Sequence, residues 1–484
     1  MKNMLSPIRS WFSPSLRKRL LSCCVWISVG QLSHAATPPN ILLILSDDHS
    51  APHLGCYGTK DLNTPRLDQM ARDGMIFTRA YTTAPQCVPS RASILTGRSP
   101  VAIDMTRFSA PLPKEVVTLP DLLMESGYFT GLMGRTHHLD GTNQPGPIGA
   151  AFKELGLATM ASRVDVINED PDRTKATAYF EEFLNKAGDK PWFLQFCYRD
   201  PHRPNDAGDH PAPESLTLPG HYPDLPITRA MLGRYYKAIE RLDGDVGALL
   251  DILKQRGLDS NTLVIFMGDN GAAQLRGKGT LYEFGIHVPL VARWPKVIKP
   301  GTQSDQLISG EDITPTLLAV AGAEIPKSMT GVSFLPLLKD KPFTGRAELF
   351  SERGPHASSL PINTGAFDLS RAIVTPTHKL IYNALPKLIY LPVDFGYDAE
   401  WYEVMAANQR DLLSPEQKAA YFPLERPMFE LYDLSKDPFE LNNLAGKKEF
   451  AALELELRER LAVWMIKERD YLPLPHPKYP KPTH

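Results

Sequence analysis

The chain has 484 residues, of which 43% are hydrophobic and 22% are charged, a composition that excludes disorder and collagen-like structure. The 53 basic and 55 acidic side chains leave a net charge of −2, so no nucleic-acid partner is expected and any anion must be bound locally. The 44 prolines are roughly twice the usual share of about 5% and predict ordered loops that build pockets.

The first 35 residues have the pattern of a secretory signal peptide. Basic residues precede an apolar stretch at 20–32, and small residues follow up to Ala35, which suits cleavage there. The alternative is an uncleaved anchor. No later stretch approaches the ~20 apolar residues of a membrane span, so no integral membrane segment is expected after signal removal. These features predict a secreted or periplasmic protein.

Removal of the signal peptide leaves Cys56, Cys87 and Cys197, an odd number that argues against a disulfide framework. A remaining cysteine in an exported protein is either buried and inert or kept for its chemistry.

Strand-like and helix-like runs alternate through residues 36–345. Apolar runs predict strands, at 40–46, 128–133, 192–198 and 262–267. Amphipathic runs predict helices, at 64–73, 118–126 and 228–256. This alternation predicts a doubly wound α/β sheet.

Residues 346–484 have a different pattern and are predicted to form a smaller α+β domain. Short strand-like runs lie at 372–374, 379–382 and 429–433, and a closing helix is expected at 450–469.

Two predicted strands end in oxygen-bearing side chains. Asp47 and Asp48 follow the first strand, and Asp269 and Asn270 follow the run at 262–267. Ligands collect at the carboxyl ends of strands in open α/β sheets, and carboxylate and amide oxygens suit Ca²⁺ or Mg²⁺. Taken singly, these residues could be a helix cap and an Asn-Gly turn. Taken together, they favour a metal site.

Residues 87–97 read CVPSRASILTG, in which Cys87 precedes a helix predicted to begin near Ser90. Arg91 in the first turn would create an anion site together with the free backbone N–H groups. The run resembles the C-x-P-S-R-x-x-x-L-T-G signature of the type I sulfatases and matches every fixed position.

The resemblance to this family extends over nearly the whole mature chain. It implies an alkaline-phosphatase-like fold, with a doubly wound mixed sheet and a smaller C-terminal α+β domain. It also implies that a formylglycine-generating maturation enzyme oxidises Cys87 to 3-oxoalanine (formylglycine), whose hydrated aldehyde attacks sulfur. By the same resemblance, Asp47, Asp48, Asp269, Asn270 and the modified Cys87 bind one Ca²⁺. The ligand types alone also permit Mg²⁺.

Three further segments resemble family motifs that contact sulfate. YRDPHRP at 198–204 places His202 in the P-H-x-P position, and KGTLYE at 278–283 places Lys278 in the position that pairs with sulfate. GRTHHLDG at 134–141 departs from the usual G-K-W-H-L-G. Arg135 replaces the lysine, and either His137 or His138 could be the catalytic histidine; we favour His138.

The substrate expected from the resemblance is a sulfated mono- or oligosaccharide. The segment around His202 and the acidic, aromatic insert at 390–402 look most like the N-sulfoglucosamine sulfohydrolases, which cleave sulfamate. An O-sulfated sugar remains an alternative. A phosphonate or phosphate monoester hydrolase of the same superfamily and a non-catalytic protein that binds sulfated glycans are the rival functions.

Overall fold

The computed structural model describes residues 38–475 except 109–110, 142–145, 170 and 357–366. The predicted signal peptide therefore lies outside the described residues. Among the described residues, no helix is both long enough and apolar enough to cross a membrane.

An eight-stranded mixed sheet forms the centre of the larger part of the fold. Its strands, in spatial order, are β5 (Val166–Asn168), β4 (Phe129–Met133), β6 (Trp192–Cys197), β1 (Asn40–Ser46), β7 (Thr262–Gly268), β8 (Leu290–Arg293), β2 (Met75–Phe77) and β9 (Thr302–Ser304). Strands β4, β6, β1 and β7 run parallel, whereas β8 is antiparallel to both of its neighbours. The four strands predicted for this region are therefore the parallel centre of the sheet.

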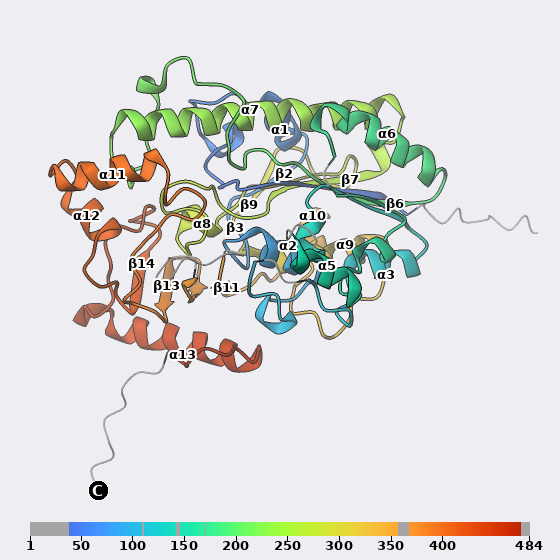
Figure 1. Cartoon of the computed structure of the whole chain (residues 1–484). Helices are drawn as coiled ribbons and strands as arrows, with labels where there is room; N and C mark the ends of the chain where they lie inside the picture. Colours follow the sequence, from blue (N-terminus) through green and yellow to red (C-terminus); the bar gives the residue numbers. More distant parts are fainter. Residues whose placement is uncertain (1–37, 109–110, 142–145, 170, 357–366, 476–484) are drawn as a thin grey trace, which may run out of the picture. The chain divides into compact units, whose positions relative to one another are not determined.

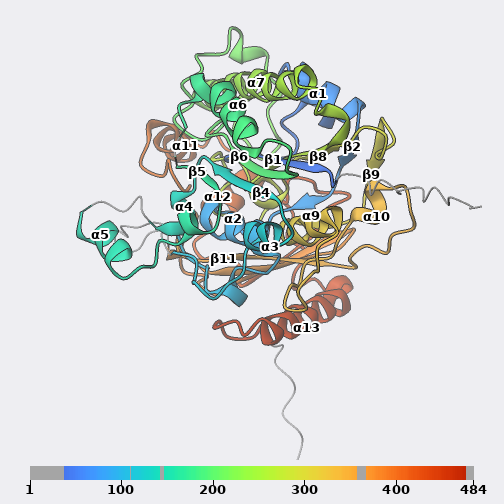
Figure 2. The ribbon, with the colours of Figure 1, turned by 90° about the vertical axis from the view of Figure 1, so that its right-hand side faces the viewer.

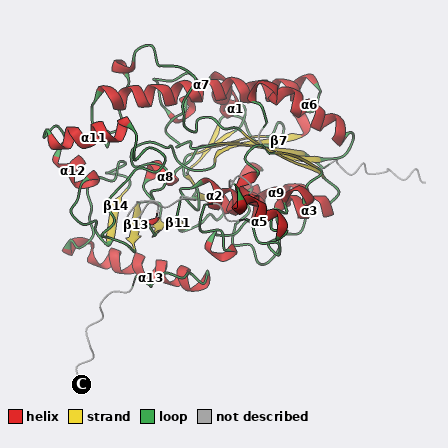
Figure 3. Cartoon of the chain, viewed as in Figure 1, coloured by secondary structure: helices red, strands yellow, loops and turns green. Residues whose placement is uncertain are grey.

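Helices cover both faces of this sheet and make three layers (Figures 1, 2 and 3). One face is covered by α1 (Pro65–Arg72), α6 (Ala176–Ala187) and α7 (Pro226–Gln255). The other is covered by α2 (Cys87–Thr96), α3 (Leu119–Glu125), α9 (Ile313–Ala321) and α10 (Leu335–Leu338).

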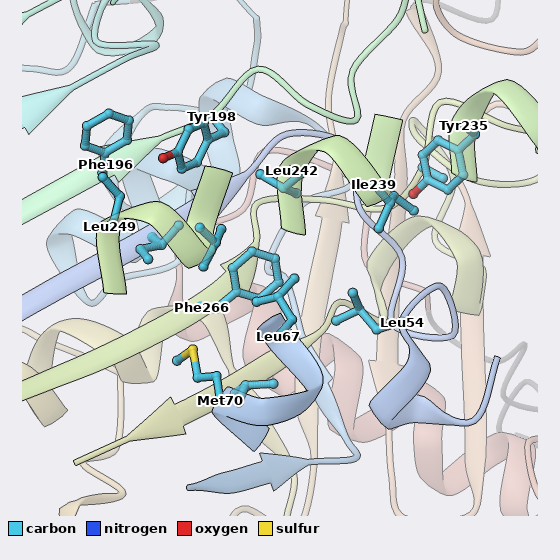
Figure 4. Packing of buried hydrophobic residues seen from close by; sticks show 14 of the residues in the cluster. Leu54, Leu67, Met70, Phe196, Tyr198, Tyr235, Ile239, Leu242, Leu249 and Phe266 are labelled. Carbon is cyan, nitrogen blue, oxygen red and sulfur yellow. The ribbon is translucent and has the colours of Figure 1, made fainter. Parts of the chain in front are cut away.

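Strand β1 is wholly buried because both of its faces meet a helical layer. Leu42 and Ile44 pack with the layer that contains α7, while Ile41 and Leu43 pack with the layer that contains α2. Figure 4 shows the first of these cores, in which Leu67 from α1 and Leu242 from α7 lie close to Phe266 of β7.

A second, antiparallel sheet belongs to the C-terminal part of the chain. Its order is β11 (Leu349–Arg353), β12 (Ser370–Val374), β13 (His378–Asn383) and β14 (Phe429–Asp433). One face packs on α13 (Ala451–Lys467), which lies beneath it in Figure 1. The other face contributes to a core that also contains Tyr81 and Leu281 from the larger part.

Other strands and α-helices of the described residues belong neither to the two main sheets nor to the helices named above. They are the pair β3 (Ala80–Tyr81) and β10 (Ile308–Ser309), together with α4 (His137–Asp140), α5 (Pro147–Glu154), α8 (Glu283–Ile286), α11 (Ala399–Gln409) and α12 (Pro415–Tyr421).

Candidate active site

The predicted oxygen ligands lie side by side because β1 and β7 are parallel neighbours. Ser46 is in register with Gly268, so Asp47 and Asp48 emerge beside Asp269 and Asn270, and all four side chains are fully buried. The backbone N–H of Asp48 donates to Asp269 Oδ1 at 2.9 Å, and Asn270 Nδ2 donates to Asp48 Oδ1 at 2.8 Å. The end of the sheet thus gathers three carboxylates and one amide.

These four residues fit a hard divalent cation. Asn270 Oδ1 is buried and accepts no hydrogen bond from the described part of the chain, so one amide oxygen is available as a ligand. Ligand atoms of Asp47, Asp48 and Cys87 all lie within 4.8 Å of one another. Burial raises the pKa of Asp269 and the carboxylates of Asp47 and Asp48 raise it further, although Arg91 lowers it. A bound cation would relieve this concentration of negative charge.

Cys87 is the first residue of α2, whereas the sequence predicted a helix beginning near Ser90. Pro89 fits the first turn because the N–H that proline lacks has no helical partner there. The Sγ atom of Cys87 lies 3.3 Å from Asp47 Oδ1 and 3.8 Å from Asp48 Oδ1. Burial raises the pKa of the Cys87 thiol well above its usual value, and Asp47 raises it further. The unmodified side chain is therefore a protonated thiol and a poor nucleophile.

Arg91 lies one helical turn after Cys87 and on the same face of α2. Its guanidinium contacts Asp269 Oδ2 through Nε at 3.0 Å and lies 3.6 Å from Asp47 Oδ2 through Nη2. Arg135, which follows β4, contacts the same Asp47 Oδ2 atom through its Nε atom at 2.7 Å. Burial opposes ionisation of Asp47, but Arg135, His202 and Arg91 together hold its pKa well below the usual range.

Arg135 reaches the site because the chain turns sharply after β4. Gly134 has a φ of 81°, and a Cβ atom there would lie 2.1 Å from the carbonyl oxygen of Cys197. Only glycine fits this close approach between the ends of two neighbouring strands.

Lys278 and His202 complete the set of basic side chains around these carboxylates. Lys278 Nζ lies 2.9 Å from Asp48 Oδ1 and 2.8 Å from Asp394 Oδ2, so the ammonium bridges two carboxylates. His202 Nε2 lies 3.7 Å from Asp48 Oδ2. The side chains of Arg91, Arg135, Lys278 and His202 thus all lie near the aspartates that follow β1.

The two candidate histidines open α4 and differ in their surroundings. His138 is buried, and its ring contacts Phe108 edge to face with centroids 5.6 Å apart. Burial lowers the pKa of His138 well below its usual value, and the charge of nearby Arg91 lowers it further. His137 is half-buried. Asp47 acts in the opposite direction and raises the pKa of His138.

Two residues of this site, Asp394 and His356, do not belong to any motif identified in the sequence. Asp394 lies on the loop between β13 and α11, and His356 follows β11; His356 Nε2 is 3.4 Å from Asp394 Oδ1. The acidic, aromatic insert at 390–402 contains Asp394, so its composition was the available signal. Nothing in the sequence near His356 indicated that it lies at the site.

Comparisons with known proteins define the family to which this chain belongs. The family described as Sulfatase matches residues 39–323, and the family described as N-sulphoglucosamine sulphohydrolase, C-terminal, matches residues 271–381. The chain therefore belongs to the sulfatase family, as its resemblance predicted, and it is a sulfuric-ester or sulfamate hydrolase.

Individual relatives agree with this assignment. The chain is 29% identical over 458 residues to an ulvan-active sulfatase of Formosa agariphila, covering 90% of this chain and 81% of that protein. It is 28% identical over 495 residues to the N-sulphoglucosamine sulphohydrolase of Homo sapiens, covering 93% of this chain and 94% of that protein.

A solved structure of a protein in complex with its substrate D-glucosamine-2-N,6-O-disulfate has the same fold. The TM-score is 0.64 at 20% identity, over 90% of this chain and 99% of that one. The alkaline-phosphatase-like fold with a separate C-terminal sheet is thereby confirmed.

Proposed function

We propose that this chain removes sulfate ester or sulfamate groups from saccharides, using Cys87 in its formylglycine form and one Ca²⁺ or Mg²⁺. The observation that carries the proposal is the convergence of Cys87 Sγ, the carboxylates of Asp47 and Asp48, and the Lys278 ammonium within hydrogen-bonding or ion-pairing distance. The proposal also includes the signal peptide at 1–35, which directs the protein to the periplasm or the exterior, a catalytic domain at 36–345 and a C-terminal domain at 346–484.

The proposed metal ligands are Asp47, Asp48, Asp269, Asn270 and the modified residue 87. When present, the cation would polarise the sulfate group and the formylglycine hydrate would supply the attacking hydroxyl. A dedicated formylglycine-generating enzyme must act on Cys87 before the buried side chain becomes inaccessible.

The cationic side chains bind and orient the sulfate. Arg91 and Arg135 each present a planar guanidinium beside Asp47, which suits two oxygens of one sulfate group. Lys278 is held between Asp48 and Asp394 and contributes a third positive charge. Preorganised cations of this kind stabilise the charge that develops on the sulfate oxygens in the transition state.

We assign the proton transfers to two histidines, the half-buried His202 and the buried His138. His202 Nε2 faces Asp48 at 3.7 Å, where it can donate a proton to the oxygen or nitrogen of the leaving group, a role that Lys278 could share. His138 has a lowered pKa and is therefore neutral near pH 7, so its ring can accept a proton when sulfate is expelled.

The first experiment is a measurement of inorganic sulfate released from a panel of saccharides by protein co-produced with a formylglycine-generating enzyme. The panel contains N-sulfoglucosamine, O-sulfated glucosamines and galactose sulfates. Release from N-sulfoglucosamine alone would establish a sulfamidase, and release from O-sulfated sugars alone would keep the mechanism and discard that substrate. Phosphate and phosphonate monoesters are included, and their preferential hydrolysis would contradict the proposal.

The role of Cys87 has its own test. Cys87→Ala removes the proposed nucleophile and should lower kcat by at least about 10³-fold while the protein stays folded. Cys56→Ala changes a half-buried cysteine elsewhere and serves as the matched control. A Cys87→Ala variant that keeps most of its rate, or native protein whose Cys87 peptide has the mass of unmodified cysteine, would refute this role.

A further inference from the structure

A cavity of about 540 Å³ is lined in part by His202, whose Nε2 atom lies 3.7 Å from Asp48 Oδ2. Its lining contains two arginines, three carboxylates, one amide, one histidine and one proline. These residues are His202, Arg203, Pro204, Asn205, Arg234, Asp394, Asp398 and Glu400. Asp394 belongs both to this lining and to the ion pair with Lys278, so the cavity adjoins the groups that we propose to bind sulfate. A saccharide whose sulfate meets those groups would place its ring here.

The two arginines of the cavity share one glutamate as an ion-pair partner. Arg203 Nη2 lies 3.1 Å and Arg234 Nη2 lies 2.9 Å from the same oxygen, Glu400 Oε1. Arg203 Nη2 is also 3.4 Å from Asp398. An additional sulfate or carboxylate on the substrate would compete with Glu400 for the two guanidinium groups and would be repelled by the carboxylates of the lining.

Asp394 is held in position by its loop. Val393 packs against Gly279, where a Cβ atom would lie 2.3 Å from Val393 Cγ2, and Gly279 has a φ of 77°. On the other side of Asp394, the ring of Phe395 lies 4.9 Å from the Arg203 guanidinium. The Asp394 side chain remains 24% exposed, which leaves its carboxylate accessible from the cavity. A fixed and accessible carboxylate accepts hydrogen bonds from O–H groups and repels anions.

We propose that this cavity binds an uncharged, hydroxyl-bearing sugar ring, that Asp394 accepts a hydrogen bond from a ring hydroxyl near the scissile group, and that Glu400 excludes a second anionic substituent. The proposal rests on the proposed function and adds to it that singly sulfated sugars are the preferred substrates. Asp394 and Glu400 are therefore specificity-determining residues of the site.

The first test compares a saccharide with an aryl sulfate that has no sugar hydroxyls. For Asp394→Ala, the ratio of kcat/KM for a monosulfated glucosamine to that for 4-nitrophenyl sulfate should fall about 10- to 100-fold, mainly through KM. An equal loss on both substrates would overturn the proposal, because Asp394 would then act only by positioning Lys278.

The second test concerns the excluded anion. The wild-type protein should prefer monosulfated over disulfated glucosamine, and Glu400→Gln should shift that preference toward the disulfated sugar by about 10-fold because it frees Arg203 and Arg234. Glu403→Gln, on the same helix but exposed and paired with Arg410, is the matched control and should leave the preference unchanged. A wild-type preference for the disulfated sugar, or an unchanged preference in Glu400→Gln, would overturn the proposal.

Binding separates this proposal from the proposed function. Calorimetry in the Cys87→Ala background measures affinity for the same two sugars without turnover, so a preference for the monosulfated sugar can appear even where no sulfate is released. Absence of turnover together with this binding preference would reject the proposed reaction and keep the cavity assignment. Turnover with equal affinity for both sugars would support the proposed reaction and reject the cavity assignment.

Discussion

Asp47 and Asp48 are the residues on which the other side chains of the site converge. Arg91 and Arg135 contact the first, and Lys278 and Asn270 contact the second. Isolated buried carboxylates would take up protons, but the surrounding cations keep Asp47 ionised against its desolvation. The same cations have guanidinium and ammonium protons left to bind an anionic substrate.

The histidine pair that opens α4 gives a residue-scale prediction. His138→Ala should lower kcat by about 10²- to 10⁴-fold, because its buried, neutral ring is the proposed proton acceptor. His137→Ala is the matched variant and should lose at least about 10-fold less. The measurement is kcat for sulfate release at saturating substrate, and the reverse order of the two losses would assign the role to His137.

The residues that could be predicted from the sequence are those in contiguous motifs. Cys87 and Arg91 are four positions apart on one helix, and Asp47 and Asp48 directly follow an apolar run. Local sequence spacing was therefore sufficient to predict that these residues belong to the site. Asp394 could not be predicted individually, because its approach to Lys278 depends on how a distant loop packs against Gly279. Long-range packing of this kind leaves no periodic signal.

At the scale of elements, long buried strands were predictable and short strands were not. Strand β1 is a continuous apolar run, buried on both faces, and its predicted bounds are those observed. Strands β2 and β9 each contain three residues; β2 pairs with both β8 and β9, so these strands depend on pairing with neighbours distant in the sequence. The antiparallel β8 likewise depends on its neighbours, so its direction could not be derived from an apolar pattern.

Strand β11 gives an element-scale prediction on pH. Burial raises the pKa of Glu352 from 4.5 to about 8, helped by Asp470, while Arg371 lowers it. Arg371 is the cross-strand partner of Glu352, but its guanidinium also binds Asp470. Between pH 4.5 and about 8 the folded state holds a proton that the unfolded state releases, so stability falls as pH rises through this interval, by up to about 5 kcal/mol.

Glu352→Gln removes this titration. The melting temperature of the variant should therefore rise relative to that of the wild type as the pH is increased from 5 to 8. Glu403→Gln changes an exposed glutamate and should keep the wild-type pH dependence. Parallel melting curves for Glu352→Gln and the wild type across this range would show that the Glu352 carboxyl does not titrate as described.

At the scale of the whole molecule, the proposed metal site is assembled from segments far apart in the sequence. Its ligands follow β1 and β7 and begin α2, so they are adjacent only in the folded chain. A cation bound there stabilises the folded state over the unfolded state, by about 2.7 kcal/mol when its concentration is 100 times its Kd.

Addition of Ca²⁺ to chelator-treated protein should accordingly raise the melting temperature by a few degrees. Asn270→Ala removes one proposed oxygen ligand and should reduce this rise, whereas Asn408→Ala on α11 should not. Repetition with Mg²⁺ distinguishes the two ions by the concentration that each requires. A melting temperature that responds to neither ion would contradict the metal assignment.

The C-terminal sheet is joined to the larger part of the fold by a shared core. Ile381 of β13 is 3% exposed and packs in the cluster that contains Tyr81 and Leu281. Hydrogen bonds cross the same boundary, since Ser351 Oγ donates to the carbonyl of Thr82 at 2.7 Å. Because the second sheet covers apolar side chains of the first part, we expect the two to unfold together in one transition.

Ile381→Ala tests this coupling. The loss of buried methyl groups should destabilise the fold by about 2 to 4 kcal/mol and lower the melting temperature of a single, still cooperative transition. Ile389→Ala alters a side chain that is 60% exposed and should change stability by less than about 0.5 kcal/mol. If Ile381→Ala instead split the calorimetric trace into two transitions and shifted one alone, the C-terminal sheet would unfold independently. The loop that carries Asp394 could then leave the site while the larger sheet, with its proposed metal ligands, stayed folded.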